Sequence, residues 1–165
     1  MKILIDADSC PRQIRSIIIK AARRVEREAL FAADRILSDC NGDYVVMVKV
    51  PPGDDHADDE VAKRAQPGDL VITRDVILAS RVVKAGCIAV DDRGGVYTRE
   101  NMAERLSVRN AMKNFREAGV FSERHRPIGK KEIQLFANAL DSLLTRLLRE
   151  ESDFTAVRGQ KGEHA

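Results

Sequence analysis

The sequence has few cysteines and no long apolar run, and each absence excludes a class of protein. Cys10, Cys40 and Cys87 are odd in number and far apart, with no CxxC pair among them. A disulfide framework or a structural zinc site is therefore not expected. No apolar stretch approaches the roughly 20 residues that cross a bilayer, and no signal-peptide core precedes Asp6. We expect a cytoplasmic protein with no membrane partner.

Length and composition are those of one folded domain. The chain has 165 residues, of which 44% are hydrophobic and 33% charged. A chain of this size buries one continuous core, and this apolar content excludes a largely disordered protein. We expect one α/β domain over residues 1–150. The remaining residues, 151–165, lack apolar periodicity and are predicted to form a disordered tail.

Short apolar runs alternate with helical patterns along the chain. Strands are predicted at residues 2–5, 29–36, 44–50, 70–73 and 87–90, and helices at 11–25, 58–65, 76–85, 99–118 and 130–149. The segment 29–36 also fits an extension of the preceding helix, and the strand is the preferred interpretation. This alternation predicts a three-layer α/β fold, a mainly parallel central sheet with helices on both faces. In such sheets ligands bind at the carboxyl ends of the strands.

Aspartates follow the predicted strands at this ligand-binding end. Asp6 and Asp8 come directly after the first strand, and Asp75 comes after the fourth. Carboxylates crowded into one crevice repel one another, and a hard divalent cation relieves the repulsion. The candidate catalytic residues are Asp6, Asp8, Asp58, Asp59 and Asp75. We expect a Mg²⁺ or Mn²⁺ cofactor, with Asp6, Asp8, Asp58 and Asp75 as candidate metal ligands.

Helix capping is the structural alternative for several of these side chains. Ser9, Asp58 and Asp75 all lie close to the start of a predicted helix, where such side chains commonly act as N-caps. Asp6 differs because it directly follows a buried strand, and a buried carboxylate requires a partner. The sequence therefore favours a functional role most strongly at Asp6.

Other side chains near the predicted site are candidates for binding substrate or for structure. Ser9, Thr73, Arg74 and Arg93 are candidate substrate-binding residues, and capping or a surface ion pair is the alternative for each. Cys10 is interpreted as a packed residue rather than a nucleophile because neighbouring carboxylates disfavour a thiolate.

The helix predicted over residues 99–118 carries basic residues at steps of four, four and three. They are Arg105, Arg109, Lys113 and Arg116. Val108, Met112 and Phe115 mark an adjoining face that is expected to pack against the domain. A basic stripe is typical of a solvated face, and the alternative is a site for nucleic-acid backbone. Few aromatic residues are interleaved, so any recognition is expected to read phosphates rather than bases.

Four ordered motifs go beyond a DxD pattern. They are DADSCP at residues 6–11, ADD at 57–59, GDLVITRD at 68–75, and DDRG at 91–94 followed by YTREN at 97–101. Together they resemble the bacterial YaiI/YqxD family of uncharacterised proteins, from Lys2 to about Leu147. That family is grouped with PIN-like domains, which are metal-dependent nucleases with acids at strand ends. The usual DADAC is DADSC here, and the usual proline after Asp91 is Asp92, but neither change removes a candidate ligand.

The resemblance implies a PIN-like fold and a role for each acid. Asp6 and Asp8 match the acids after the first strand, and Asp75 matches the acid after a later central strand. Either Asp58 or Asp59 matches the acid after the second crossover.

The leading hypothesis is a Mg²⁺- or Mn²⁺-dependent nuclease that acts on nucleic acid, with RNA favoured over DNA. Arg93, together with Arg105, Arg109 and Lys113, would guide the phosphate backbone. One alternative is a phosphatase of the haloacid dehalogenase type, in which Asp6 attacks phosphorus. The other is a non-catalytic module that binds nucleic acid or a protein.

Overall fold

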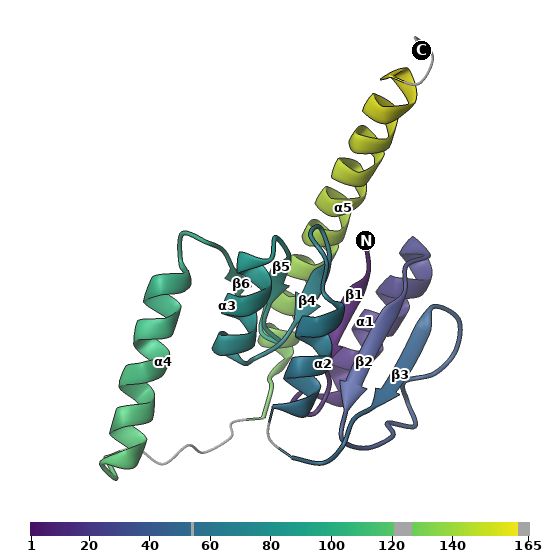
Figure 1. Ribbon diagram of the computed structural model, residues 1–165. Helices are drawn as coiled ribbons and strands as arrows, with labels where there is room; N and C mark the ends of the chain where they lie inside the picture. Colours follow the sequence, from purple (N-terminus) through teal and green to yellow (C-terminus); the bar gives the residue numbers. More distant parts are fainter. Residues whose placement is uncertain (54, 121–126, 162–165) are drawn as a thin grey trace.

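In this computed structural model the described residues, 1–53, 55–120 and 127–161, form one sheet of six strands flanked by five helices (Figure 1). The strands are β1 (Ile3–Asp6), β2 (Ala29–Ala33), β3 (Val45–Lys49), β4 (Leu70–Ile72), β5 (Ile88–Val90) and β6 (Val96–Tyr97). Their order across the sheet is β3-β2-β1-β4-β5-β6. Neighbours from β3 to β5 are parallel, and β6 is antiparallel to β5. The prediction of a mainly parallel sheet is confirmed.

Helices cover both faces of the sheet. They are α1 (Arg12–Val25), α2 (His56–Arg64), α3 (Val76–Lys84), α4 (Met102–Glu117) and α5 (Lys130–Lys161). Buried side chains of α1 and α5 share one core with the sheet, and those of α2, α3 and the start of α4 share the other. The three-layer α/β architecture is therefore confirmed.

The central strand β1 explains why the sheet-forming segments are almost entirely apolar. Ile3 and Ile5 belong to the core under α1 and α5, whereas Leu4 belongs to the opposite core. Successive side chains of a strand point to opposite faces, so a strand covered on both faces needs apolar residues throughout. The chain turns polar only at Asp6, where the strand reaches the edge of the sheet.

The path from α1 to β3 departs from regular alternation. Glu26 adopts a left-handed conformation, with φ of 53°, and ends α1, so β2 cannot continue that helix. The strand predicted at 29–36 is confirmed over its first five residues. Residues 34–44 then connect two parallel strands without a helix, with buried Leu37 and Cys40 anchoring the connection.

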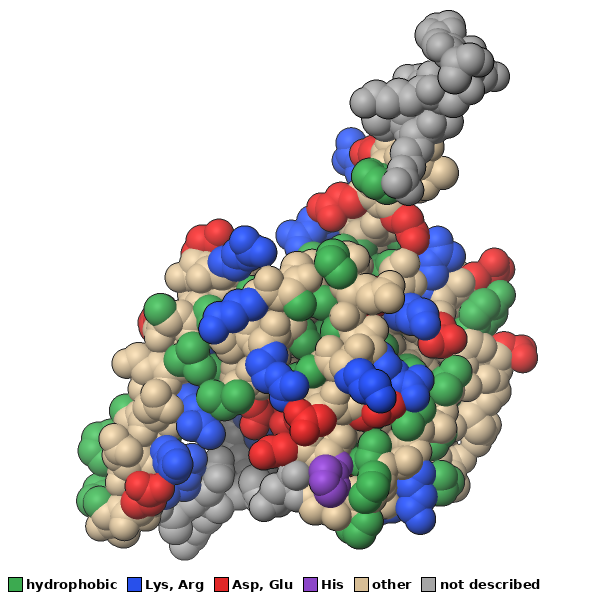
Figure 2. All heavy atoms as spheres, viewed as in Figure 1, with side chains coloured by type: hydrophobic (Ala, Val, Ile, Leu, Met, Phe, Trp, Pro, Cys, Tyr) green, Lys and Arg blue, Asp and Glu red, His purple; other side chains and the backbone are tan. Residues whose placement is uncertain are grey.

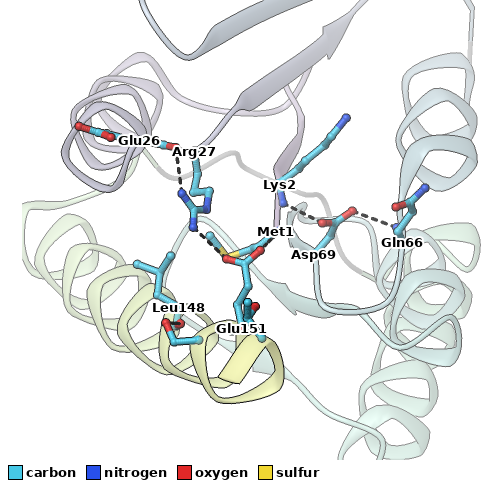
Figure 3. Close-up of polar contacts among 10 residues, drawn as sticks. Met1, Lys2, Glu26, Arg27, Gln66, Asp69, Leu148 and Glu151 are labelled. Atoms are coloured by element: carbon cyan, nitrogen blue, oxygen red, sulfur yellow. Dashed lines mark hydrogen bonds and ion pairs between the residues drawn. The ribbon is translucent and has the colours of Figure 1, made fainter. Parts of the chain in front are cut away.

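The helix α5 is longer than predicted, and the disordered tail is a wrong prediction for residues 151–161. Figure 3 shows the physical reason at the amino-terminal end of the sheet. The Glu151 carboxylate accepts the Met1 ammonium at 2.8 Å and Arg27 Nη2 at 3.0 Å. These partners come from distant parts of the sequence, so apolar periodicity could not reveal them. Residues 162–165 lie outside the described residues.

The helix α4 packs through its first turns alone. Met102 is buried and joins the core shared with α3, whereas Val108 is 57% exposed and Phe115 is 51% exposed. In Figure 1, α4 stands apart from the sheet. The prediction that Val108 and Phe115 pack against the domain is therefore wrong. No helix in the described part of the chain is both long enough and apolar enough to cross a bilayer.

Candidate functional site

The candidate site lies where the strand order reverses direction. From β1 the chain adds β2 and β3 on one side, then returns to the other side of β1 with β4. Ligands of open α/β sheets bind at the carboxyl ends of the strands beside such a switch point. Asp6 is the last residue of β1, and Thr73 directly follows β4. An open cavity of about 570 Å³ lies at this edge.

Among the described residues, six aspartates and two arginines dominate the wall of this acidic cavity. The lining residues are Asp6, Asp8, Ser9, Asp34, Arg35, Gly53, Asp55, Ala57, Asp58, Arg74 and Asp75. Figure 2 shows acidic side chains gathered below the centre of the view, with Lys and Arg side chains around them. The carboxylates outnumber the guanidinium groups, so the cavity attracts cations.

Asp6 is the buried member of the acidic cavity. Its Oδ2 accepts hydrogen bonds from Ser9 Oγ and from Thr73 Oγ1, both at 3.2 Å. Burial raises the pKa of Asp6, the nearby charge of Asp8 raises it further, and the two hydroxyl donors lower it in part. The two hydroxyls also fix the orientation of the carboxylate.

Asp75 combines a capping role with a place in the cavity wall. Its Oδ1 accepts the backbone N–H of Leu78 at 2.9 Å, which makes it the N-cap of α3. Its own backbone N–H donates to Thr73 Oγ1 at 2.9 Å. The capping alternative is therefore correct for Asp75, and the same residue still lines the cavity.

Asp8 reaches toward the end of β2 instead of toward Asp75. Its Oδ1 accepts the backbone N–H of Asp34 at 3.0 Å and lies 3.7 Å from Nη1 of Arg35. The pKa of Asp8 is raised, chiefly by burial. The end of β1 and the loop that follows it thus place one acid on each side, with Asp6 beside β4 and Asp8 beside β2.

Asp58 and Asp59, which the sequence could not separate, lie in different surroundings. Asp58 lines the acidic cavity, and its pKa is raised to about 7 by burial, followed by the charges of Asp6, Asp75 and Asp55. It does not cap α2, because Asp55 occupies the N-cap position. The side chain of Asp59 is 63% exposed and pairs with Arg81 at 2.8 Å, outside the cavity.

The oxygen atoms that line the acidic cavity are of the kind that a hard divalent cation binds. The lining side chains offer carboxylate and hydroxyl oxygens, the ligands that Mg²⁺ and Mn²⁺ prefer. Among the described residues, no three His, Cys, Asp or Glu side chains are arranged to hold a metal ion. Mg²⁺ commonly takes only one or two carboxylates from the protein and fills its remaining positions with water and substrate phosphate. The lining therefore fits an ion of this kind, without a preformed protein cage.

The candidate substrate-binding residues divide between the cavity and the surface. Ser9 and Arg74 line the cavity, and Thr73 lies directly behind Asp6. Arg93 pairs with Glu132 at 2.6 Å and does not line the cavity.

The basic residues of α4 lie outside the cavity wall. The Arg105 guanidinium stacks over the Tyr97 ring, 5.4 Å from its centroid, which is a structural contact. Arg109 donates to the neighbouring Asn110 side chain, and Lys113 pairs with Glu117 one turn later at 3.8 Å. Exposed interactions of this type leave the cations accessible to a ligand.

Four charged residues at this edge of the sheet are not among those predicted from the sequence. Asp34, Arg35 and Asp55 line the cavity, and Asp92 is buried beside Arg74. Asp34 directly follows the buried strand β2, the same signal that identified Asp6, so it could have been found. The other three depend on loop conformation. The Cys10 thiol is buried and its pKa is raised, mainly by burial, as expected of a packed residue.

Together these features define a three-layer α/β protein with an acidic cavity at the switch point of its sheet. A family model described as "Uncharacterized BCR, YaiI/YqxD family" matches residues 4–146. The chain belongs to this family, and the resemblance noted from the motifs is confirmed.

Curated relatives match the chain over nearly its whole length. A UPF0178 protein of Myxococcus xanthus is 46% identical over 151 residues, which cover 92% of this chain and 99% of the relative. One of Syntrophobacter fumaroxidans is 42% identical, covering 88% and 95%. One of Treponema pallidum is 41% identical, covering 90% and 84%. No solved structure matches the chain.

Proposed function

We propose that this protein is a divalent-metal-dependent nuclease that hydrolyses phosphodiester bonds, with RNA as the favoured substrate. The observation that carries the proposal is the set of six aspartates, counted over the described residues, around one open cavity at the sheet's switch point. Burial and mutual repulsion raise the pKa of three of them, Asp6, Asp8 and Asp58. Crowded carboxylates with raised pKa values are typical of functional sites that bind cations.

Asp6, Asp8, Asp58 and Asp75 are the candidate ligands, and one or two of them would hold the ion while water and substrate phosphate fill its other positions. A bound Mg²⁺ or Mn²⁺ lowers the pKa of a coordinated water and stabilises negative charge on the phosphate and the leaving oxygen. The protein's own contribution is orientation. Hydroxyl groups of Ser9 and Thr73 hold the Asp6 carboxylate in one orientation. A metal-binding carboxylate that is already oriented before the reaction lowers the free energy needed to reach the transition state.

Asp58 links cation binding to proton release. With a pKa of about 7, this carboxyl group is partly protonated near neutral pH when no cation is present. A cation that binds the carboxylate displaces the proton, so metal affinity should increase with pH. In the proposed reaction the same group would exchange a proton with the attacking water or with the leaving oxygen.

The basic face of α4 supports nucleic acid as the substrate class. Within the described residues, the side chains of Arg109 and Lys113 make only exposed contacts, on a helix that stands beside the body of the protein. Phosphate groups attract such cations without regard to base sequence. In this proposal an extended nucleic acid would contact α4 and the cavity together.

Hydrolysis of a labelled single-stranded RNA tests the proposal. Wild-type protein, Asp6→Asn and Asp59→Asn would each be incubated with Mn²⁺, Mg²⁺ or EDTA. Wild type and the Asp59→Asn control should cleave only with metal, and Asp6→Asn should lose at least about 100-fold of the rate. Metal-dependent cleavage that Asp6→Asn retains in full would show that a contaminant or another site is responsible.

Two outcomes would favour the alternative functions. An aspartyl-phosphate on Asp6, detected by mass spectrometry with a phosphomonoester, would favour the phosphatase. Over the part of the chain that the structure describes, the cavity lining includes two arginines and no lysine to hold a phosphoryl group in that mechanism. Failure of the wild-type protein to bind Mn²⁺ would favour the non-catalytic module.

A further inference from the structure

Asp92 is a buried carboxylate that none of the roles above explains. It is the second residue after β5, and its side chain is 5% exposed. In the described part of the chain, its Oδ1 accepts no hydrogen bond. A buried charge without a partner is strongly unfavourable. Arg74 forms the ion pair with this carboxylate, with its Nε 3.5 Å from Oδ1, and the charge of Arg93 also acts on it.

Arg74 connects this buried carboxylate to the acidic cavity. Its side chain lines the cavity, and within the described residues its guanidinium donates no hydrogen bond. A guanidinium group has five N–H donors in a planar fork. When the Nε edge faces Asp92, the terminal nitrogens remain available to an oxyanion in the cavity.

The two arginines of the cavity differ in where their carboxylate partners lie. Arg35 pairs with Asp34 at 3.2 Å and approaches Asp8 at 3.7 Å, and both acids belong to the cavity wall. The partner of Arg74 lies behind the wall, since Asp92 does not line the cavity. Arg35 is therefore paired with acids inside the cavity. Arg74 is paired with an acid outside it, so its cavity-facing side has no carboxylate partner among the described ion pairs.

We propose that Asp92 is a positioning residue that holds Arg74 in the wall of the acidic cavity, where its guanidinium binds a phosphate oxygen. The inference deepens the proposed function, because it assigns the phosphate-binding residue of that same cavity. It predicts a phosphate subsite beside β4, formed by Arg74 and supported from behind by Asp92. Asp92 itself touches no substrate.

Arginine-selective ¹H–¹⁵N NMR with inorganic phosphate as the probe tests the inference without any need for catalysis. The Nε–H signal of Arg74, assigned with Arg74→Lys, would be followed in wild type, Asp92→Asn and Asp141→Asn. Asp141→Asn is the matched control, because it removes one carboxylate from an ion pair with Arg24, remote from the cavity. Phosphate would be titrated with and without Mg²⁺, which offsets the repulsion of the aspartates.

The wild-type protein and the Asp141→Asn control should give a resolved Arg74 signal that phosphate shifts. In Asp92→Asn the signal should broaden or move toward the position of a free arginine, and phosphate affinity should fall by about 5- to 10-fold. Equal affinity in wild type and Asp92→Asn, or an Arg74 signal that phosphate leaves unchanged, would overturn the inference. A thermal melt of each variant separates these effects from unfolding.

A double-mutant cycle gives a second measurement that a merely structural role would not reproduce. Asp92→Asn should weaken phosphate binding in the wild-type background and have no further effect in the Arg74→Ala background. Equal effects in both backgrounds would also overturn the inference. Phosphate bound at Arg74 by a protein that never cleaves RNA would contradict the proposed nuclease and leave the role of Asp92 intact.

Discussion

Thr73 donates its hydroxyl proton to Asp6 across the boundary between β4 and β1, with 3.2 Å between the two oxygens. The same hydroxyl accepts the backbone N–H of Asp75 at 2.9 Å. One buried side chain therefore joins the ends of two central strands and the start of α3. The orientation of the Asp6 carboxylate and the position of Asp75 therefore depend on this hydroxyl group.

Replacing Thr73 with valine should show this dependence. Valine keeps the shape and removes both hydrogen bonds, so we expect the free energy of unfolding to fall by about 2 kcal/mol. Serine keeps the hydroxyl and loses one methyl group, which costs about 1 kcal/mol. Urea denaturation measures both values. If Thr73→Val is as stable as wild type, the hydroxyl does not hold the two strand ends together.

The raised pKa of Asp58 predicts a specific dependence of stability on pH. Its value in the folded protein is about 7, against 3.8 for an ordinary aspartate. Between these values the folded state binds more protons than the unfolded state, so stability falls as pH rises from about 4 to 7. We expect Asp58→Asn to reduce this fall by about 1 to 3 kcal/mol.

Denaturation at pH 5 and pH 8, in EDTA and in Mg²⁺, measures the contribution of Asp58. Mg²⁺ should reduce the fall in the wild-type protein, because the cation compensates the charge that deprotonation creates. The control Asp59→Asn, outside the cavity, should behave as wild type. An identical pH profile for wild type and Asp58→Asn would show that Asp58 titrates as an ordinary surface aspartate.

The basic face of α4 predicts nucleic-acid binding that weakens as salt increases. Replacing Arg109 and Lys113 with alanine should make the slope of log K against log salt shallower by about 1.4, because each phosphate contact on a single strand contributes about 0.7. Arg105 is left in place because it stacks on Tyr97. Fluorescence anisotropy of a single-stranded RNA measures the slope.

A matched control for α4 replaces Lys20 and Lys84, two exposed cations on other helices. This variant should keep the wild-type slope. If both double variants change the slope equally, the effect reflects net charge alone and α4 is merely a solvated face.

Much of the fold could be predicted because the central strands are apolar on both faces. The run Ile3–Ile5 predicts β1 without any knowledge of its neighbours, and the motif of Gly68 to Asp75 predicts β4 and the start of α3 in the same way. By contrast, β6 has two residues and depends on the turn that brings Val96 beside Val90. The end of α5 depends on Glu151, whose partners lie more than 100 residues away in sequence.

Of the candidate site, the sequence predicts only the residues that follow a buried strand. Asp6 and Asp75 were found because each follows a buried strand. Asp58 could not be distinguished from Asp59, because the rotation of α2 relative to the sheet decides which one enters the cavity. Asp92 could not be recognised, since its contact with Arg74 joins the segments after β5 and β4, whose side-by-side placement the local sequence does not reveal.

The central claim is a metal site that depends on Asp6. The most direct test measures whether Mn²⁺ stabilises the protein and whether this stabilisation requires Asp6. Thermal melts of wild type, Asp6→Asn and Asp59→Asn would be recorded in EDTA and in Mn²⁺. Asp6→Asn keeps a hydrogen-bond acceptor for Ser9 and Thr73 and removes one of the crowded charges, so in EDTA it should be no less stable than wild type. Mn²⁺ should raise the melting temperature of wild type and Asp59→Asn by several degrees and that of Asp6→Asn by much less. An equal rise in all three proteins, or no rise in any of them, would contradict the account.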